Sequence, residues 1–94
     1  MVKTSELRGL DVITSDAFTL GEVEGTEVDT KSWRLTHLHI ELTEDATKEL
    51  GFRKPILGHV TLCLPVERIK AFGDVITLKG EMAGVKDYPE CKHL

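Results

Sequence analysis

The chain has 94 residues, a formal net charge of −4 and only 5% aromatic residues, with 40% hydrophobic and 30% charged residues overall. These values indicate one small folded domain with a core of Val, Ile and Leu, which association with a second copy would help to stabilise. The acidic excess lies entirely within residues 1–32. Because acidic surfaces repel phosphate backbones, the charge argues against a general nucleic-acid-binding protein.

We expect no targeting signal. The N-terminal residues have no apolar run behind them, and no stretch is long enough to span a membrane. We therefore expect a cytoplasmic protein. Cys63 and Cys91 could form one bridge, but in a cytoplasmic setting we expect them to be reduced thiols.

The first part of the chain reads as a β-hairpin followed by a bent strand. Residues 12–13 and 18–20 predict two short strands across the polar turn 14–17. In the acidic segment that follows, Glu22 and Glu24 occupy even positions, whereas Glu27 and Asp29 occupy odd ones. This slip in alternation at residues 25–26 predicts a β-bulge, and bulged, bent strands are typical of small barrels.

The clearest strand is predicted over residues 33–42, after a turn at residues 30–32. One face of it is apolar throughout, while the opposite face is half apolar; that face holds Trp33, Leu35, His37, His39 and Glu41. A strand with one apolar and one mixed face often contacts a core on one side and a partner on the other.

A short helix is predicted next. Thr43 is a good N-cap, Glu44 and Asp45 suit the positive end of a helix, and Gly51 is a natural C-terminal residue. Ala46 and Leu50 would form its buried stripe. The following loop, residues 52–57, would be anchored by Phe52 and Ile56.

The last third predicts two more strands, at residues 59–64 and 75–78, joined by a polar corner and a turn at residues 73–74. Residues 81–94 have weak periodicity and read as a C-terminal tail that adds a sheet edge or stays mobile. The expected architecture is mainly β: a small bent β-barrel with one short helix near residues 44–50. The expected domain spans residues 1–80, with a tail at 81–94.

Three stretches resemble a known family. They are Ser5 to Ile13, Ala17 to Asp29, and Leu64 to Leu78 with its Pro-Val-Glu corner. Together they are similar to a PRC-barrel domain over about residues 5–78, and the insert at residues 43–55 resembles small stand-alone archaeal members.

The resemblance implies a compact β-barrel without catalytic residues, used as a protein-interaction or adaptor module. Relatives include parts of the photosynthetic reaction centre H subunit and of a bacterial ribosomal RNA maturation factor. Some archaeal members act in cell division with membrane-anchor proteins of the division ring, and they tend to self-associate. The expected partners are therefore proteins, including a second copy in a homodimer, without direct nucleic-acid contact or membrane insertion.

Histidines and a cysteine form the best candidate for chemistry. If the strands that carry them are neighbours in register, His37, His39, His59 and Cys63 could surround a zinc ion. The simpler interpretation is that these four residues line a mixed, partly exposed sheet face. A metal- or small-ligand-binding barrel is thus an alternative function, although we expect no cofactor.

We find no pattern for catalysis. Cys63 is expected in mid-strand, without a helix N-terminus to activate it, and the glycines form no phosphate-binding loop. We therefore expect a non-enzymatic module. Its interface would be Trp33, Leu35, His37 and His39, for self-association or partner contact. Ribosome or RNA maturation is a further alternative that the acidic balance disfavours.

Overall fold

The computed structural model describes residues 3–53, 58–86 and 88. The elements are α1 (Thr4–Leu7), β1 (Asp11–Ile13), β2 (Thr19–Asp29), β3 (Arg34–Leu42), α2 (Glu44–Glu49), β4 (Thr61–Pro65), η1 (Val66–Arg68), β5 (Ile69–Phe72), β6 (Ile76–Leu78) and α3 (Met82–Val85). Among these described residues, no helix is long and apolar enough to cross a membrane.

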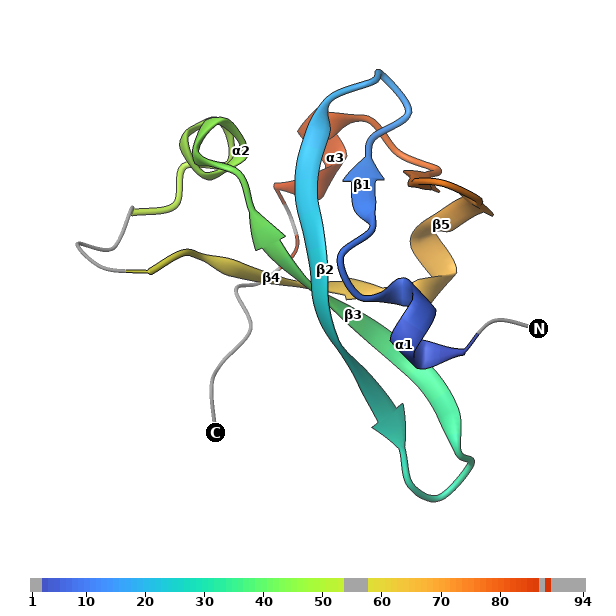
Figure 1. The fold of residues 1–94 in the computed structure, drawn as a ribbon. Helices are drawn as coiled ribbons and strands as arrows, with labels where there is room; N and C mark the ends of the chain where they lie inside the picture. Colours follow the sequence, from blue (N-terminus) through green and yellow to red (C-terminus); the bar gives the residue numbers. More distant parts are fainter. Residues whose placement is uncertain (1–2, 54–57, 87, 89–94) are drawn as a thin grey trace.

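The strands form one strongly curled sheet of six strands, in the order β4-β3-β2-β1-β6-β5 (Figure 1). All neighbours are antiparallel except β1 and β6, which are parallel. Strands β4 and β5 lie at opposite ends of this order, yet only the short turn η1 separates them in sequence. The two ends of the sheet must therefore approach each other, and the sheet closes toward a small barrel. The expected mainly β, barrel-like fold is confirmed.

Two irregularities bend the long β2–β3 ribbon. Val23 pairs with Ile40 and Gly25 with His39, so Glu24 is an extra residue in β2. This is the predicted bulge, one residue earlier than residues 25–26. Further along, the register shifts again between Glu27 and Val28. Each shift changes the side-chain alternation and increases the local twist of the ribbon.

The core fills the inside of the curled sheet. The predicted apolar row of β3 is buried, as is the alternating row of Val60, Leu62 and Leu64. The buried hydrophobic residues are Leu7, Val12, Leu20, Val23, Leu38, Ile40, Leu42, Ala46, Val60, Leu62, Leu64, Ile76, Leu78, Met82 and Val85. Leu, Ile and Val make up most of this set, as the composition predicted.

Helix α2 forms as predicted. The Thr43 hydroxyl accepts a 3.0 Å hydrogen bond from the N–H of Ala46, which satisfies one of the free donors at the helix start. Gly51 ends the helix with φ of +76°, a conformation that glycine adopts without strain. Ala46 is buried, and Leu50 and Phe52 pack against the core. Ile56, the other expected anchor, lies outside the described residues.

Four elements differ from the sequence-based expectation. The polar corner after Pro65 contains η1 and an additional strand, β5, which pairs with β6 across the predicted turn at residues 73–74. Residues 4–7 form α1, which places Leu7 in the core. Residues 82–85 form α3, whose Met82 and Val85 are buried. This part of the expected tail is therefore neither a sheet edge nor mobile. Residues 87 and 89–94 of the expected tail lie outside the described residues.

Candidate functional site

The outer surface of β2, β3 and the residues just before β4 carries glutamates and histidines in close contact. We call it the histidine–glutamate face, and its members are Glu24, Glu27, His37, His39, Glu41 and His59. The bulge at Glu24 explains its composition. In an uninterrupted strand Glu24 and Glu27, three residues apart, would point to opposite sides, but the extra residue turns both outward.

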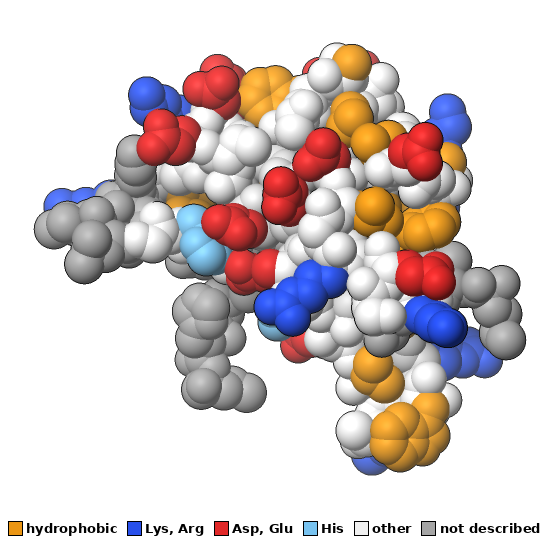
Figure 2. All heavy atoms as spheres, in the orientation of Figure 1, with side chains coloured by type: hydrophobic (Ala, Val, Ile, Leu, Met, Phe, Trp, Pro, Cys, Tyr) orange, Lys and Arg blue, Asp and Glu red, His pale blue; other side chains and the backbone are white. Residues whose placement is uncertain are grey.

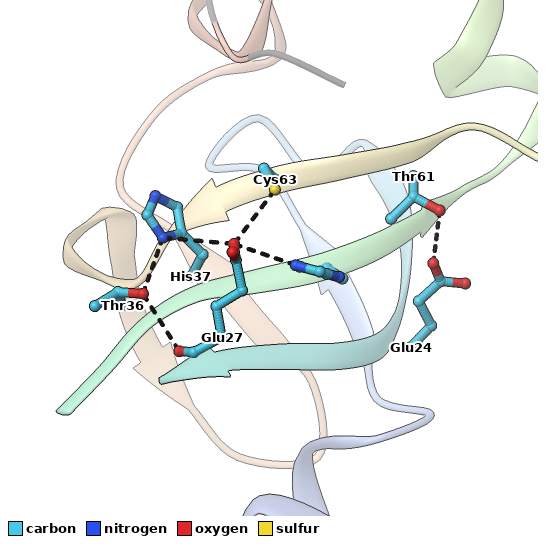
Figure 3. Close-up of polar contacts among 7 residues, drawn as sticks. Glu24, Glu27, Thr36, His37, Thr61 and Cys63 are labelled. Carbon is cyan, nitrogen blue, oxygen red and sulfur yellow. Dashed lines mark hydrogen bonds and ion pairs between the residues drawn. The ribbon is translucent and has the colours of Figure 1, made fainter. Parts of the chain in front are cut away.

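Glu27 lies at the centre of one half of this face (Figure 3). Its Oε2 atom is 3.2 Å from Nε2 of His39 and 3.7 Å from Nδ1 of His37. The Nε2 atom of His39 is shielded from solvent and makes no hydrogen bond to any described residue. The Glu27 carboxylate is close to this atom, but the two groups are not aligned for a hydrogen bond. The hydroxyl of Thr36 contacts His37 Nδ1 at 3.0 Å.

Glu24 organises the other half. Its Oε1 accepts a 2.6 Å hydrogen bond from the Thr61 hydroxyl, and its Oε2 is 2.8 Å from Nε2 of His59. The opposite ring nitrogen of His59, Nδ1, is 3.3 Å from Oε1 of Glu41. Burial acts to raise the pKa of Glu24, but the hydrogen bonds from Thr61 and His59, with the charges of His59 and His39, outweigh it and lower that pKa below 4.5.

The four proposed zinc ligands do not converge. Strands β3 and β4 are neighbours, as the hypothesis required, and His39 pairs directly with Cys63. His59, however, belongs with Glu24 and Glu41, while His37 and His39 belong with Glu27. Among the described residues, His37, His39, His59 and Cys63 therefore do not form one group of possible ligands, and zinc binding by these four stays an untested prediction.

Cys63 differs from expectation in its chemistry as well. It is disulfide-bonded, so the prediction of a reduced thiol is wrong for this residue. Its Sγ lies 3.5 Å from Oε2 of Glu27. Because a disulfide sulfur carries no proton, this contact is not a hydrogen bond, and the sulfur is not available as a thiolate ligand.

The tip of the β2–β3 ribbon carries exposed apolar side chains. The ribbon projects beyond the rest of the described chain (Figure 1), and hydrophobic side chains gather at its end (Figure 2). Trp33 is 77% exposed and Val28 is 43% exposed. Val28 pairs with Leu35, which is partly buried against the core. The tip thus carries exposed apolar side chains. Because Val28 directly follows Glu27 in β2, Val28 and its pair Leu35 point to the opposite face of the ribbon from Glu27 and His37.

Trp33 occupies an unusual backbone position. It lies in the turn before β3 rather than in the strand, with φ of +57°. Its N–H donates a 2.6 Å hydrogen bond to the carbonyl of Asp29, which closes the turn. Glycine and asparagine are the residues that usually adopt this left-handed conformation, whereas a bulky side chain there is strained. The other three expected interface residues, Leu35, His37 and His39, lie in β3.

A separate hollow lies between η1, β6 and α3. It has a volume of about 250 Å³ and is lined by Arg68, Leu78, Gly80, Glu81, Gly84, Val85 and Tyr88. The guanidinium of Arg68 lies over the ring of Tyr88 at 5.8 Å, a cation–π contact. The charged group of Arg68 therefore already has a partner within the domain.

The family assignment rests on most of the sequence rather than on any one site. The PRC-barrel domain model matches residues 1–81. The chain belongs to the PRC-barrel domain family. The match includes the stretch from residue 5 to residue 78 on which the resemblance was based. PRC-barrel domains are generally non-catalytic. A comparison with curated proteins found no match.

The sequence did not reveal the glutamates as partners of the histidines. Glu24, Glu27 and Glu41 were visible only as outward-facing acidic residues. The slip in alternation was the available signal, because it implied that Glu24 and Glu27 share one face. Which histidine each glutamate contacts depends on the β2–β3–β4 register, which the sequence does not give.

Proposed function

We propose that this PRC-barrel domain is a non-enzymatic protein-interaction module. Its contact region would be both faces of the end of the β2–β3 ribbon, which we call the hairpin surface and define as Val28, Trp33, Leu35, His37 and His39. The first of these was not part of the interface predicted from the sequence; it joins because it is exposed and pairs with Leu35. The proposal is one of binding, and it assigns no reaction to the domain.

Trp33 is the observation that supports the proposal most strongly. A left-handed backbone costs a non-glycine residue about 1–2 kcal/mol. The indole is 77% exposed, so its burial within the domain offsets little of that cost. A residue that is strained and exposed is favoured where a partner covers it, because tryptophan supplies a large contact area when it is buried at an interface.

A second copy of the chain fits this surface. The hairpin surface is apolar at the tip, and its two histidines lie beside Glu27. In a two-fold dimer, if one residue of the first copy contacts a second residue of the other copy, the reverse contact forms as well. A surface that carries both acidic and basic groups can therefore be complementary to itself. The homodimer would also cover Val28 and Trp33, which are exposed in the single chain.

The cellular role is proposed from the family resemblance alone. Small stand-alone archaeal relatives suggest an adaptor in cell division that binds division-ring or membrane-anchor proteins. A dimeric adaptor would present two equivalent surfaces and so bring two partner molecules together.

The adaptor proposal is tested by cross-linked affinity capture from the native cells with three baits. The baits are the wild-type chain, Trp33→Gly and Phe72→Ser. Phe72 is 45% exposed on β5, away from the β2–β3 tip, so Phe72→Ser is a matched control for loss of an exposed apolar side chain. We expect division-ring or membrane-anchor proteins to be captured by wild type and Phe72→Ser, and to be lost with Trp33→Gly. Equal capture by all three baits would exclude the hairpin surface as the contact.

A further inference from the structure

Glu24, Glu41 and His59 come together from β2, β3 and the residue pair that precedes β4. One possible ligand atom from each lies within 4.8 Å of the other two. His59 Nε2 is 2.8 Å from Glu24 Oε2, and His59 Nδ1 is 3.3 Å from Glu41 Oε1. All three side chains remain partly exposed, at 27%, 46% and 39% for Glu24, Glu41 and His59, so an ion from solvent can reach them.

Two features of the fold fix Glu24 in this group. The bulge turns its side chain outward, and the Thr61 hydroxyl holds Oε1 at 2.6 Å. This bond reaches from β2 across β3 to β4, because β2 and β4 are not neighbours in the sheet. Thr61 itself is 1% exposed, so it is a rigid support. A carboxylate oriented by a second hydrogen-bonding group is the arrangement that surrounds metal ions in proteins.

We propose that Glu24, Glu41 and His59 form a binding site for a divalent transition metal ion, with zinc as the favoured ion. Two carboxylate oxygens and one imidazole nitrogen are a ligand set that zinc accepts, with water completing a fourth position. Calcium is disfavoured, because it takes six to eight oxygen ligands and no nitrogen. The ring of His59 contacts both carboxylates and so already brings the three side chains together.

The neighbouring group of Glu27, His39 and Cys63 is also compact. It is not the proposed site, because the sulfur of Cys63 is in a disulfide. Glu27 of this group and the nearby His37 serve instead as controls, since they lie on the same face and are similarly exposed.

The proposal is tested by titrating zinc into the untagged full chain after treatment with a chelator, using calorimetry. We expect one equivalent to bind to wild type, and binding at this site to weaken by at least about tenfold in Glu24→Gln and His59→Gln. The matched controls Glu27→Gln and His37→Gln should bind as wild type does. Equal binding by wild type and His59→Gln, or no binding by wild type, would overturn the proposal.

A second readout separates ligation from folding. Thermal unfolding without metal should show that all four variants are folded, and added zinc should raise the melting temperature of wild type but not that of His59→Gln. Thr61→Val keeps the shape of the side chain but removes the bond to Glu24. We expect it to weaken zinc binding by about tenfold while one equivalent still binds. Unchanged zinc affinity in Thr61→Val would show that Thr61 does not position Glu24 for the metal. An equal zinc-induced rise in melting temperature in His59→Gln and wild type would place the metal at another site.

Discussion

Oδ1 of Asp16 accepts a 3.1 Å hydrogen bond from the backbone N–H of Met82, 66 residues further along the chain. Asp16 lies in the turn between β1 and β2, and Met82 is the first residue of α3. The first N–H groups of a helix have no partner within the helix, so the carboxylate acts as a cap supplied by another part of the fold. The same oxygen accepts a hydrogen bond from the Thr14 hydroxyl. This pair connects the first hairpin to the last described helix.

Removing that cap should loosen α3. In Asp16→Ala we expect faster hydrogen exchange of the Met82 amide and of the amides that follow it, with little change in β2 and β3. Exchange measured by NMR or mass spectrometry checks this. Asp11→Ala, in which an exposed acid on β1 is removed, is the control. If Met82 exchanges at the wild-type rate in Asp16→Ala, the carboxylate does not stabilise the start of α3.

The contribution of Asp16 should depend on pH. The Thr14 hydroxyl lowers the pKa of Asp16 below 3.8; desolvation opposes this, and the Met82 N–H assists it. Because the folded pKa is below the unfolded one, the stabilisation is complete above about 3.8 and is lost as the pH falls through the folded pKa. The melting temperature of wild type should therefore exceed that of Asp16→Asn at neutral pH, and the difference should shrink below about pH 4. A difference that stays constant down to about pH 2 would contradict this assignment.

Gly21 should tolerate no side chain. A Cβ atom at this position would overlap the backbone carbonyl oxygen of Glu41 on the neighbouring strand. Since backbone cannot move aside without breaking the β2–β3 pairing, we expect Gly21→Ala to lower the free energy of unfolding by about 3 kcal/mol or more. Urea denaturation measures this. Gly80→Ala, where a Cβ meets no atom within 4 Å, should change stability far less, and equal effects in the two variants would exclude the close approach as the cause.

Replacing Trp33 with glycine should make the isolated domain more stable. Glycine adopts φ of +57° without strain, so Trp33→Gly should gain about 1 kcal/mol in the free energy of unfolding of the monomer. Trp33→Ala removes the indole but retains the strain, and it should not show this gain. Denaturation at concentrations low enough to keep the chains monomeric compares the two. A loss of stability in Trp33→Gly relative to Trp33→Ala would show that the left-handed conformation is not strained.

The strands were predictable where a residue pattern has only one structural solution. The alternation of Leu38, Ile40 and Leu42 indicated β3, and Thr43 with Gly51 indicated α2. The phase change between Glu24 and Glu27 indicated the bulge. In each case a local steric or hydrogen-bonding rule sufficed.

The missed elements depend on contacts between distant residues. Helix α3 has four residues and begins at an N–H that Asp16 caps from 66 positions away, so its own sequence carries no strong helix signal. Strand β5 is only four residues long and largely exposed, which removes the hydrophobic alternation that would indicate it. The division of the histidines between Glu24 and Glu27 is likewise set by strand register.

Sedimentation equilibrium on the untagged chain tests the central proposal, that the hairpin surface binds a second copy, most directly. Wild type and Phe72→Ser should sediment as dimers of the 10.5 kDa chain, and Trp33→Gly should sediment as a folded monomer. Trp33→Gly is preferable to Leu35→Asp for this purpose, because Leu35 also packs against the core. A monomeric wild type, or a Trp33→Gly variant that dimerises as tightly as wild type, would contradict the account.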